Sequence, residues 1–366
     1  MAAPKSPDRQ ENVTPDPDRP DRSDSLMTVH RRVRTGARPD TVPCAGCGAD
    51  VAAARRGPLP KWCGQTCRQR GWERRRAAAE LVQHPAVRAA AFTGSYAGGR
   101  ALFDLAVSRP DPIPFYGELG SVNPAIVTPL AAQRGKPLAI EYLDSLTLGT
   151  GQFCTNPGLL LIPAGSGLTQ LIADEADTRQ PGVMLHAGIA ELFRRNVAHL
   201  AALPGVRAPV NGSTVNAPGT WSGPTILAAD QHAATANPEL LHTECFGPAA
   251  IVIEYASEQG LLELISRLEG CLVATVHGNE NEPIAAAVVQ RLARITGRVV
   301  WNDWPTGVAV TAAQHHGGPH PATTNSLHTS VGGAAVLRFL RPVAYQSVPN
   351  ALLPRALRET PDNQHA

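Results

Sequence analysis

The chain has 366 residues, of which 43% are hydrophobic and 17% charged, and its formal net charge at pH 7 is +2. A chain of this length and apolar content can bury a large core and is expected to form two or three domains. The near-neutral balance argues against nucleic acid as a partner of the whole chain, although it permits a local basic patch.

The sequence carries no signal for membranes or export. No apolar run reaches the roughly 18 residues that a spanning helix needs, and the N-terminus lacks the apolar core of a signal peptide. We therefore expect a cytoplasmic protein with no membrane partner. The odd number of cysteines, seven, disfavours a secreted disulfide framework and favours reduced thiols with separate roles.

The composition changes along the chain. Residues 1–42 are rich in Pro, Asp, Arg and Ser and nearly free of large apolar side chains. Such a segment cannot offset the entropy lost on ordering, so we expect it to be disordered. From residue 81 onward, short apolar strands alternate with amphipathic helices, which is typical of an α/β fold.

A predicted zinc knuckle lies between these parts, over residues 43–80. Two close pairs of cysteines, fifteen residues apart, match the four thiolate ligands of tetrahedral zinc: Cys44, Cys47, Cys63 and Cys67. The arginine-rich helix that follows allows a nucleic-acid contact, or a merely solvated surface on a segment that needs a structural metal to fold. Because no base-reading or stacking residues accompany the arginines, we favour the second interpretation.

A glycine-rich turn opens the α/β part. A predicted strand over 87–93 is followed by Gly-Ser-Tyr-Ala-Gly-Gly at 94–99 and then by a helix. Small residues let a pyrophosphate approach the backbone, and the helix N-terminus offers free N–H donors and a favourable dipole. The candidate cofactor contacts are Gly94, Ser95 and Gly99. The alternative is that these glycines serve packing only.

The next candidate is an acidic residue at a strand end. A second predicted strand, over 113–119, carries Glu118 next to a Gly-Ser turn. A carboxylate there is either a general base held over a cleft or a solvated charge. Taken alone, the sequence favours the solvated charge.

Cys154 is the candidate nucleophile. It lies in Gly-Thr-Gly-Gln-Phe-Cys-Thr-Asn-Pro at 149–157, between a predicted helix over 138–148 and a predicted strand over 159–162. The two glycines permit backbone angles that side chains disfavour, so the thiol can lie in a cleft among backbone N–H groups. The alternative is a buried thiol that only fills space. The motifs elsewhere in the chain favour the interpretation of Cys154 as a nucleophile.

A polar cluster precedes a predicted strand over 249–254. Within Glu-Cys-Phe-Gly-Pro at 244–248, Glu244 can hold a ribose and Phe246 can pack on a flat ring; otherwise they are a turn charge and a core aromatic. The remaining predicted elements are a helix over 187–203, strands over 225–229, 272–277 and 298–302, and a helix over 283–295.

Three histidines lie in a glycine-rich loop, His315, His316 and His320. They suggest a metal site, but Gly-Gly-Pro forces a turn and no carboxylate accompanies them in the sequence. We expect the loop to be structural or to face the substrate. An apolar segment over 334–340 and a terminal strand are expected after it.

Four motifs in a fixed order are together similar to the aldehyde dehydrogenase superfamily. They are Phe-Thr-Gly-Ser at 92–95, Glu-Leu-Gly at 118–120, Gly-Gln-Phe-Cys-Thr at 151–155 and Glu-Cys-Phe-Gly-Pro at 244–248. Asn-Asp-Trp-Pro-Thr-Gly at 302–307 and His-Gly-Gly-Pro-His-Pro-Ala-Thr-Thr at 316–324 most resemble its α-ketoglutaric semialdehyde (2,5-dioxovalerate) dehydrogenase branch, which is usually NADP-dependent. The resemblance covers about 81–354.

The resemblance implies a role for each matched residue. Cys154 attacks an aldehyde to give a thiohemiacetal, hydride passes to NADP or NAD, and Glu118 activates the water that hydrolyses the resulting thioester. The turn at 94–99 holds the pyrophosphate, Glu244 the nicotinamide ribose, and Phe246 the nicotinamide side.

The resemblance also implies an architecture: an aldehyde dehydrogenase-like α/β fold with a partial Rossmann-type cofactor domain and an α/β catalytic domain. We expect a remnant of the cofactor domain over 81–135, the catalytic domain over 136–325 and a C-terminal strand and tail over 326–366. Family chains carry further cofactor-domain strands, an oxyanion-holding Asn and a ribose-binding Lys upstream, so a truncated cofactor domain with poor NADP turnover is expected.

Two function classes follow. The first is an enzyme that acts on a small aldehyde and forms a homo-oligomer, as the resemblance implies. The second is a non-catalytic zinc-knuckle protein whose dehydrogenase body is a relic, with nucleic acid as the candidate partner.

Overall fold

The structure is a computed structural model that describes residues 41–43, 50–52, 76–212, 220–308 and 310–358. Two short strands, β1 (Thr41–Pro43) and β2 (Asp50–Ala52), pair antiparallel. The four predicted zinc ligands, Cys44, Cys47, Cys63 and Cys67, lie outside the described residues, as does most of the segment predicted to be disordered. Within the described part of the chain, the helices are too short or too polar to cross a bilayer.

A seven-stranded sheet forms the main body, in the order β13-β12-β5-β6-β11-β10-β8. All neighbouring strands are parallel except the edge pair β10 and β8. The strands are β5 (Pro124–Val127), β6 (Leu159–Pro163), β8 (Arg207–Val210), β10 (Thr225–Asp230), β11 (Ala249–Tyr255), β12 (Cys271–His277) and β13 (Thr296–Trp301). Central strands such as Leu-Leu-Leu-Ile of β6 are apolar throughout because both faces of a parallel sheet are covered.

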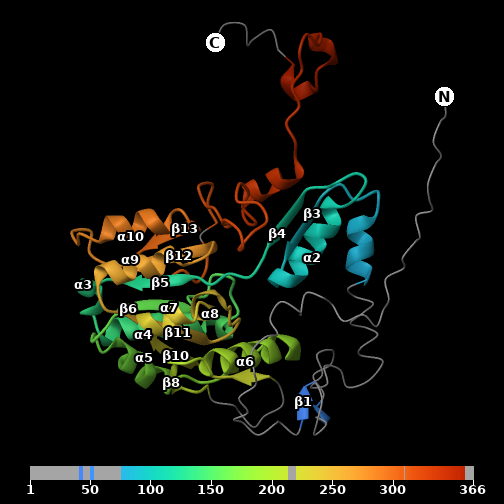
Figure 1. Ribbon diagram of the computed structural model, residues 1–366. Coiled ribbons are helices and arrows are strands. Elements are labelled where there is room, and N and C mark those ends of the chain that lie inside the picture. Colours follow the sequence, from blue (N-terminus) through green and yellow to red (C-terminus); the bar gives the residue numbers. More distant parts are fainter. Residues whose placement is uncertain (1–40, 44–49, 53–75, 213–219, 309, 359–366) are drawn as a thin grey trace, which may run out of the picture. The chain divides into compact units, whose positions relative to one another are not determined.

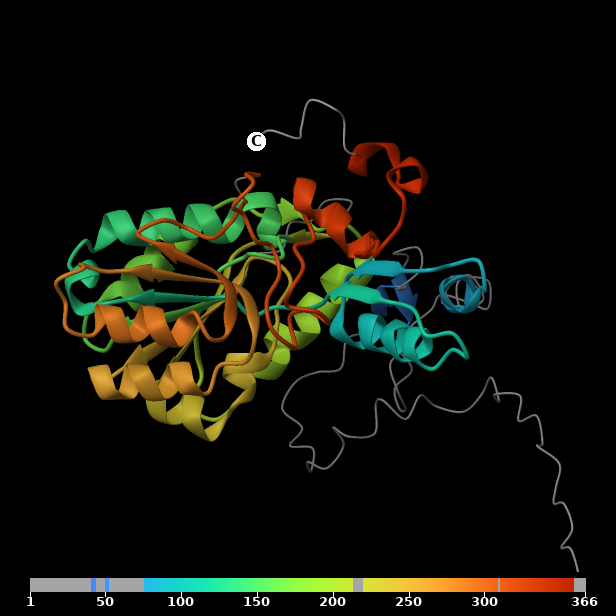
Figure 2. The same ribbon diagram turned by 90° about the horizontal axis from the view of Figure 1, so that it is seen from above.

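Helices flank this sheet on both faces (Figures 1 and 2). One buried cluster joins the sheet to α3 (Pro129–Ala132), α4 (Lys136–Thr147) and α5 (Leu168–Ala176). The cluster on the other face includes side chains of α6 (Ala187–Ala201), α7 (Gln231–Ala236), α8 (Glu239–His242), α9 (Glu258–Ser266) and α10 (Ala285–Leu292). Two covered faces account for the strand and helix alternation that the sequence predicts from residue 81 onward.

A second, smaller sheet precedes it. Strands β3 (Ala90–Thr93) and β4 (Phe115–Glu118) pair in parallel, and α2 (Tyr96–Val107) connects them. Strand β5 pairs within the large sheet, although the sequence analysis placed it in the cofactor-domain remnant over 81–135. Another two-stranded pair joins β7 (Gly182–Val183) to β9 (Trp221–Ser222).

The C-terminal strand predicted within 326–366 is wrong for the described residues 326–358. They form short 3-10 segments, η3 (Gly333–Phe339), η4 (Asn350–Leu352) and η5 (Arg355–Leu357). Pro342, Pro349 and Pro354 interrupt the stretch after η3. Proline has no N–H and a fixed φ, so a regular ladder of hydrogen bonds cannot run through these positions.

Cys154 follows a left-handed turn within η2 (Leu148–Gly151), where Gly149, Thr150 and Gly151 have φ of 57°, 59° and 66°. The glycine freedom expected at 149 and 151 is thus used. Gly151 also lies against the backbone of the 244–248 segment, since a Cβ there would come within 2.3 Å of the Gly247 carbonyl. The loop that holds Cys154 and the loop that holds Glu244 therefore touch backbone to backbone.

Replacing Gly151 with Ala should cost more stability than replacing Gly165, a matched glycine. Both have positive φ, but nothing lies within 4 Å of a Cβ at Gly165. In each variant a residue with a Cβ must adopt the left-handed conformation, which lowers the free energy of unfolding by ~1–2 kcal/mol. Gly151→Ala should lose about 1–3 kcal/mol more in urea unfolding, because its Cβ overpacks the backbone. Equal losses at the two positions would contradict the close approach.

Candidate active site

Three segments that are far apart in the sequence meet at one end of the strands of the large sheet. Glu118 and Asn123 precede β5, Cys154 precedes β6, and Glu244 precedes β11. Because these strands are parallel, the segments that precede them all lie at the amino-terminal ends of the strands. The topology thus explains why motifs more than a hundred residues apart form one site.

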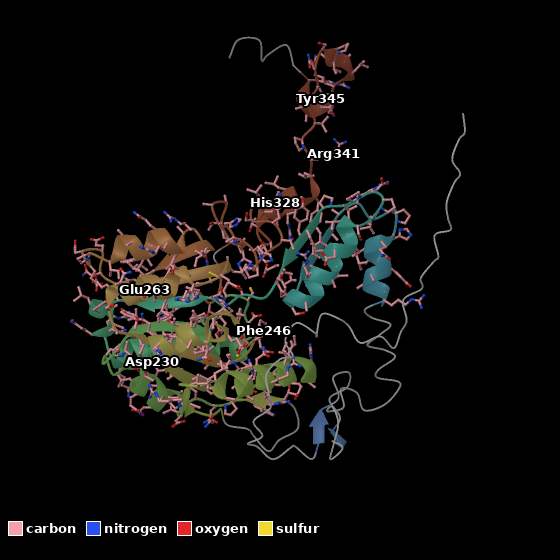
Figure 3. The ribbon with its side chains drawn as sticks, viewed as in Figure 1. Asp230, Phe246, Glu263, His328, Arg341 and Tyr345 are labelled. Atoms are coloured by element: carbon pink, nitrogen blue, oxygen red, sulfur yellow. The ribbon has the colours of Figure 1, made fainter. Side chains whose placement is uncertain are left out.

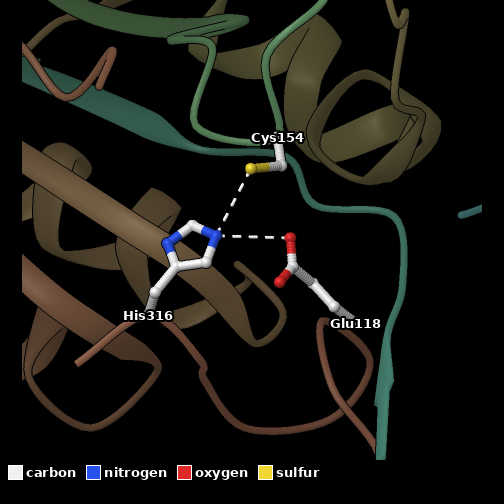
Figure 4. Close-up of side chains that lie close together, drawn as sticks. All are labelled: Glu118, Cys154 and His316. Atoms are coloured by element: carbon white, nitrogen blue, oxygen red, sulfur yellow. Dashed lines mark hydrogen bonds and ion pairs between the residues drawn. The ribbon is translucent and has the colours of Figure 1, made fainter. Parts of the chain in front are cut away.

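Cys154 and Glu118 converge on one side chain of the histidine loop, His316 (Figure 4). The Cys154 Sγ lies 3.3 Å from His316 Nε2, and Glu118 Oε1 lies 3.2 Å from the same nitrogen. Glu118 and His316 are buried, with exposed fractions of 6% and 4%. The carboxylate that the sequence did not place near the histidines is therefore supplied by the fold.

Pairing with β4 holds the histidine loop against Glu118. The Leu119 N–H donates to the Ala322 carbonyl at 2.7 Å, and the Thr324 N–H donates to the Gly117 carbonyl at 3.0 Å. Ser330 donates its hydroxyl proton to Glu118 Oε2. Glu118 is thus a buried, fixed carboxylate, and the solvated-charge interpretation is wrong.

The protonation states of the pair follow from burial and charge. Burial, followed by the neighbouring Glu118 charge, raises the pKa of Cys154 to about 12, although its own backbone N–H favours the thiolate. Burial also acts to raise the pKa of Glu118, but hydrogen bonds from His316 and Ser330 outweigh it and hold that pKa below its usual value. At neutral pH the cluster therefore holds a neutral thiol next to an ionised carboxylate.

A buried amide, Asn123, fixes the cysteine loop. Its Nδ2 donates to the Cys154 carbonyl at 2.8 Å and to the Asn156 carbonyl at 3.1 Å. Its Oδ1 accepts from the Ser121 hydroxyl at 2.7 Å and from the Val273 N–H at 3.3 Å. One side chain thereby joins the β4–β5 link, the cysteine loop and β12.

The far side of the cysteine loop is held by the segment 302–307. The Gly307 N–H donates to Thr155 Oγ1 at 3.4 Å, and the Thr306 hydroxyl lies 2.6 Å from that of Ser145 in α4. Arg298 supports the segment through its Nη2, which donates to the Pro305 and Gly307 carbonyls at 2.7 and 3.0 Å. Burial lowers the pKa of Arg298, while the negative charge of a Cys154 thiolate opposes that shift.

Three of the five predicted cofactor residues line one pocket of about 470 Å³: Ser95, Glu244 and Phe246. The side chain of Phe246 is labelled among the sticks of Figure 3. Burial raises the pKa of Glu244 to about 7, against a hydrogen bond from the Ser121 backbone. The Ser95 hydroxyl accepts from the Gly98 N–H at 3.3 Å and caps α2.

The remaining two, Gly94 and Gly99, do not line that pocket. A Cβ at Gly94 would lie 2.8 Å from the Phe92 ring, and one at Gly99 would lie 2.1 Å from Leu119 Cδ2. These contacts match the packing alternative for the glycines. Gly99 in particular lets α2 approach the β4 end closely.

A model of the aldehyde dehydrogenase family matches residues 71–338. The chain belongs to the aldehyde dehydrogenase family. It is 44% identical over 285 residues to α-ketoglutaric semialdehyde dehydrogenase 2 of Azospirillum brasilense, covering 76% of this chain and 54% of that protein. It is 42% identical over 290 residues to the α-ketoglutaric semialdehyde dehydrogenase of Acinetobacter baylyi, covering 78% of this chain and 55% of that protein. The chain therefore spans about half the length of these curated relatives.

Solved structures confirm the aldehyde dehydrogenase fold. A 1-pyrroline-5-carboxylate dehydrogenase from Thermus with bound NAD matches with a TM-score of 0.58 at 21% identity, over 72% of this chain and 51% of that one. An NAD-dependent aldehyde dehydrogenase from Sinorhizobium meliloti matches with a TM-score of 0.58 at 22% identity, over 72% of this chain and 51% of that one.

Sequence reasoning missed several residues of this candidate site. Asn123 and Ser330 carried no local signal, because an amide or hydroxyl next to a turn is common. His316 was named within its loop but was not assigned to Cys154. The adjacent histidines were a signal, but only the β4 pairing shows which of them turns toward the cysteine.

Proposed function

We propose that this chain oxidises an aldehyde to a carboxylate with NADP or NAD through a thioester on Cys154. The observation that supports this most is the buried cluster in which a thiol and an ionised carboxylate face one another across His316. A relic scaffold would not need to keep such a costly arrangement of buried polar groups. The rival proposal, a non-catalytic zinc-knuckle protein, is therefore not favoured.

Cys154 forms the covalent bond. Its sulfur attacks the aldehyde carbon, and its proton passes to the Glu118 carboxylate, which is ionised and buried beside it. The carbonyl oxygen takes up the electron pair and becomes the oxyanion of a thiohemiacetal. The Cys154 backbone N–H, in a loop fixed by Asn123, contributes to holding that oxyanion.

Glu118 first releases the thiol proton to solvent and then completes the reaction by accepting a proton from water. Once the thioester has formed, that water attacks the acyl carbon, the carbon–sulfur bond breaks, and the carboxylate product leaves. The Cys154 sulfur regains a proton from Glu118. The same carboxylate therefore serves both half-reactions, which its position next to the thiol permits.

The residues of the 470 Å³ pocket fit the nicotinamide, ribose and phosphate portion of a dinucleotide. Glu244 offers a carboxylate to ribose hydroxyls, Phe246 an aromatic wall, and Ser95 a hydroxyl at the start of α2. When bound, the cofactor accepts the hydride that leaves the aldehyde carbon. NADP as the preferred form is part of the proposal.

We propose α-ketoglutaric semialdehyde as the substrate because two curated relatives above 40% identity bear that name. A cationic side chain, Arg298, supports the segment 302–307, which contacts the cysteine loop through Gly307 and Thr155. A cation in this position suits a substrate that carries a carboxylate. The structural zinc ion at the four N-terminal cysteines, a homo-oligomeric state and a cytoplasmic location stay predictions from the sequence.

Ester hydrolysis without cofactor tests the two catalytic roles separately. With 4-nitrophenyl acetate, Cys154→Ala should lose the catalysed rate, because the nucleophile is gone. Glu118→Gln should keep a burst of nitrophenol, because the thiol can still lose its proton to solvent, and should lose ~10²–10⁴-fold in the steady rate, because hydrolysis of the acyl group needs the base. The control is Cys271→Ala, which removes a buried thiol of β12 that is 1% exposed. A Cys154→Ala rate equal to that of the parent would contradict the proposal.

Cofactor affinity should depend on pH through Glu244. The ionised carboxylate is the stronger acceptor for ribose hydroxyls, so affinity should rise as pH rises through about 7, the raised pKa of this residue. If only the ionised form binds well, the dissociation constant at pH 6 should be about tenfold that at pH 8. Glu244→Gln should remove this dependence.

The matched control for that titration is Glu239→Gln, a nearby glutamate paired with His199 at 2.9 Å. NAD should be titrated beside NADP, because the extra phosphate of NADP itself titrates near pH 6. The same pH dependence in the parent and in Glu244→Gln would exclude Glu244 from the ribose site.

A further inference from the structure

We propose that Glu118, Cys154 and His316 also form a binding site for a thiophilic divalent cation, and that Zn²⁺ is the ion it fits best. This inference rests on the geometry of the three side chains and does not depend on the proposed dehydrogenase activity. It is separate from the four-cysteine zinc site predicted near the N-terminus.

The spacing of the three donor atoms suits zinc. Oε1 or Oε2 of Glu118, Sγ of Cys154 and a ring nitrogen of His316 all lie within 4.8 Å of one another. The measured separations of 3.3 Å and 3.2 Å are close to the edges of a tetrahedron with bond lengths of ~2.3 Å to sulfur and ~2.0–2.1 Å to nitrogen and oxygen. Small adjustments would therefore place an ion between them.

Both contacts of His316 use the same nitrogen, as the two dashed lines in Figure 4 show. A proton relay from thiol to carboxylate would need one ring nitrogen for each partner, because a single nitrogen either donates or accepts. His316 is therefore not placed as the relay of a Cys-His-Glu triad. A shared cation is an occupant that satisfies all three atoms at once.

The charges and the surroundings also suit an ion. Binding would replace the Cys154 thiol proton, which passes to solvent, so thiolate and carboxylate together neutralise the two positive charges. Ser330 holds the second oxygen of Glu118, as outer-shell groups do in metal sites.

An ion bound here would occupy the nucleophile and the base together. Zinc would therefore act as a reversible inhibitor of any reaction that Cys154 performs. Aldehyde and zinc would compete for the same sulfur.

Cobalt binding tests the site without an activity assay. Purified full-length protein is stripped with chelator and titrated with Co²⁺, whose thiolate charge-transfer band and visible bands report sulfur ligation and tetrahedral geometry. Because the N-terminal cysteines are expected to bind metal as well, the readout is the difference between the parent and Cys154→Ala. The parent should bind one more Co²⁺ ion per chain than Cys154→Ala, and Zn²⁺ should displace that ion.

The other ligands and a matched thiol complete the test. Loss of an outer-shell partner typically lowers metal affinity ~10–100-fold, so Ser330→Ala should lower the affinity for this Co²⁺ ion by about that factor. The ligand variants Glu118→Gln and His316→Ala should lower the same affinity further. Cys271→Ala should keep this ion. Circular dichroism checks the fold of each variant. Equal cobalt stoichiometry in the parent and Cys154→Ala, or loss of this ion in Cys271→Ala, would overturn the proposal.

Discussion

The side-chain amide of Asn123 is the contact on which the site most depends. It is buried, with 1% of its surface exposed, and four hydrogen bonds use its full set of acceptor and donor positions toward three segments of the chain. Leaving such a group unpaired costs ~1–3 kcal/mol for each lost partner. The cysteine loop therefore has one stable position relative to β5 and β12, and Cys154 stays near Glu118.

Glu118 gives the site its chemical character. Burial alone would raise the pKa of this carboxylate, but hydrogen bonds from His316 and Ser330 hold that pKa below its usual value. The Glu118 charge in turn adds to burial in raising the pKa of the Cys154 thiol. The resting cluster is thus a protonated nucleophile beside a ready base. The same pairing of thiol, imidazole and carboxylate makes the cluster attractive to a soft cation.

Much of this site could be predicted from sequence because its motifs are local. Cys154, Glu118 and Glu244 each stand in a short pattern before a strand, and parallel pairing then gathers them at one edge. His316 could not be assigned, because its partner is 198 positions away and only the pairing of 322–324 with β4 brings it in. Among residues 326–358, the expected C-terminal strand is not formed, because the prolines after η3 prevent regular pairing.

The pH profile of Cys154 alkylation tests most directly whether Glu118 controls the thiol. The rate constant for iodoacetamide, followed on the Cys154 peptide by mass spectrometry, should still be rising above pH 9 in the parent, because its thiol pKa is raised to about 12. Glu118→Gln removes the opposing charge, so labelling at pH 8 should become faster, by about tenfold for each unit that the thiol pKa falls. A plateau near neutral pH in the parent, or no acceleration in Glu118→Gln, would contradict the account.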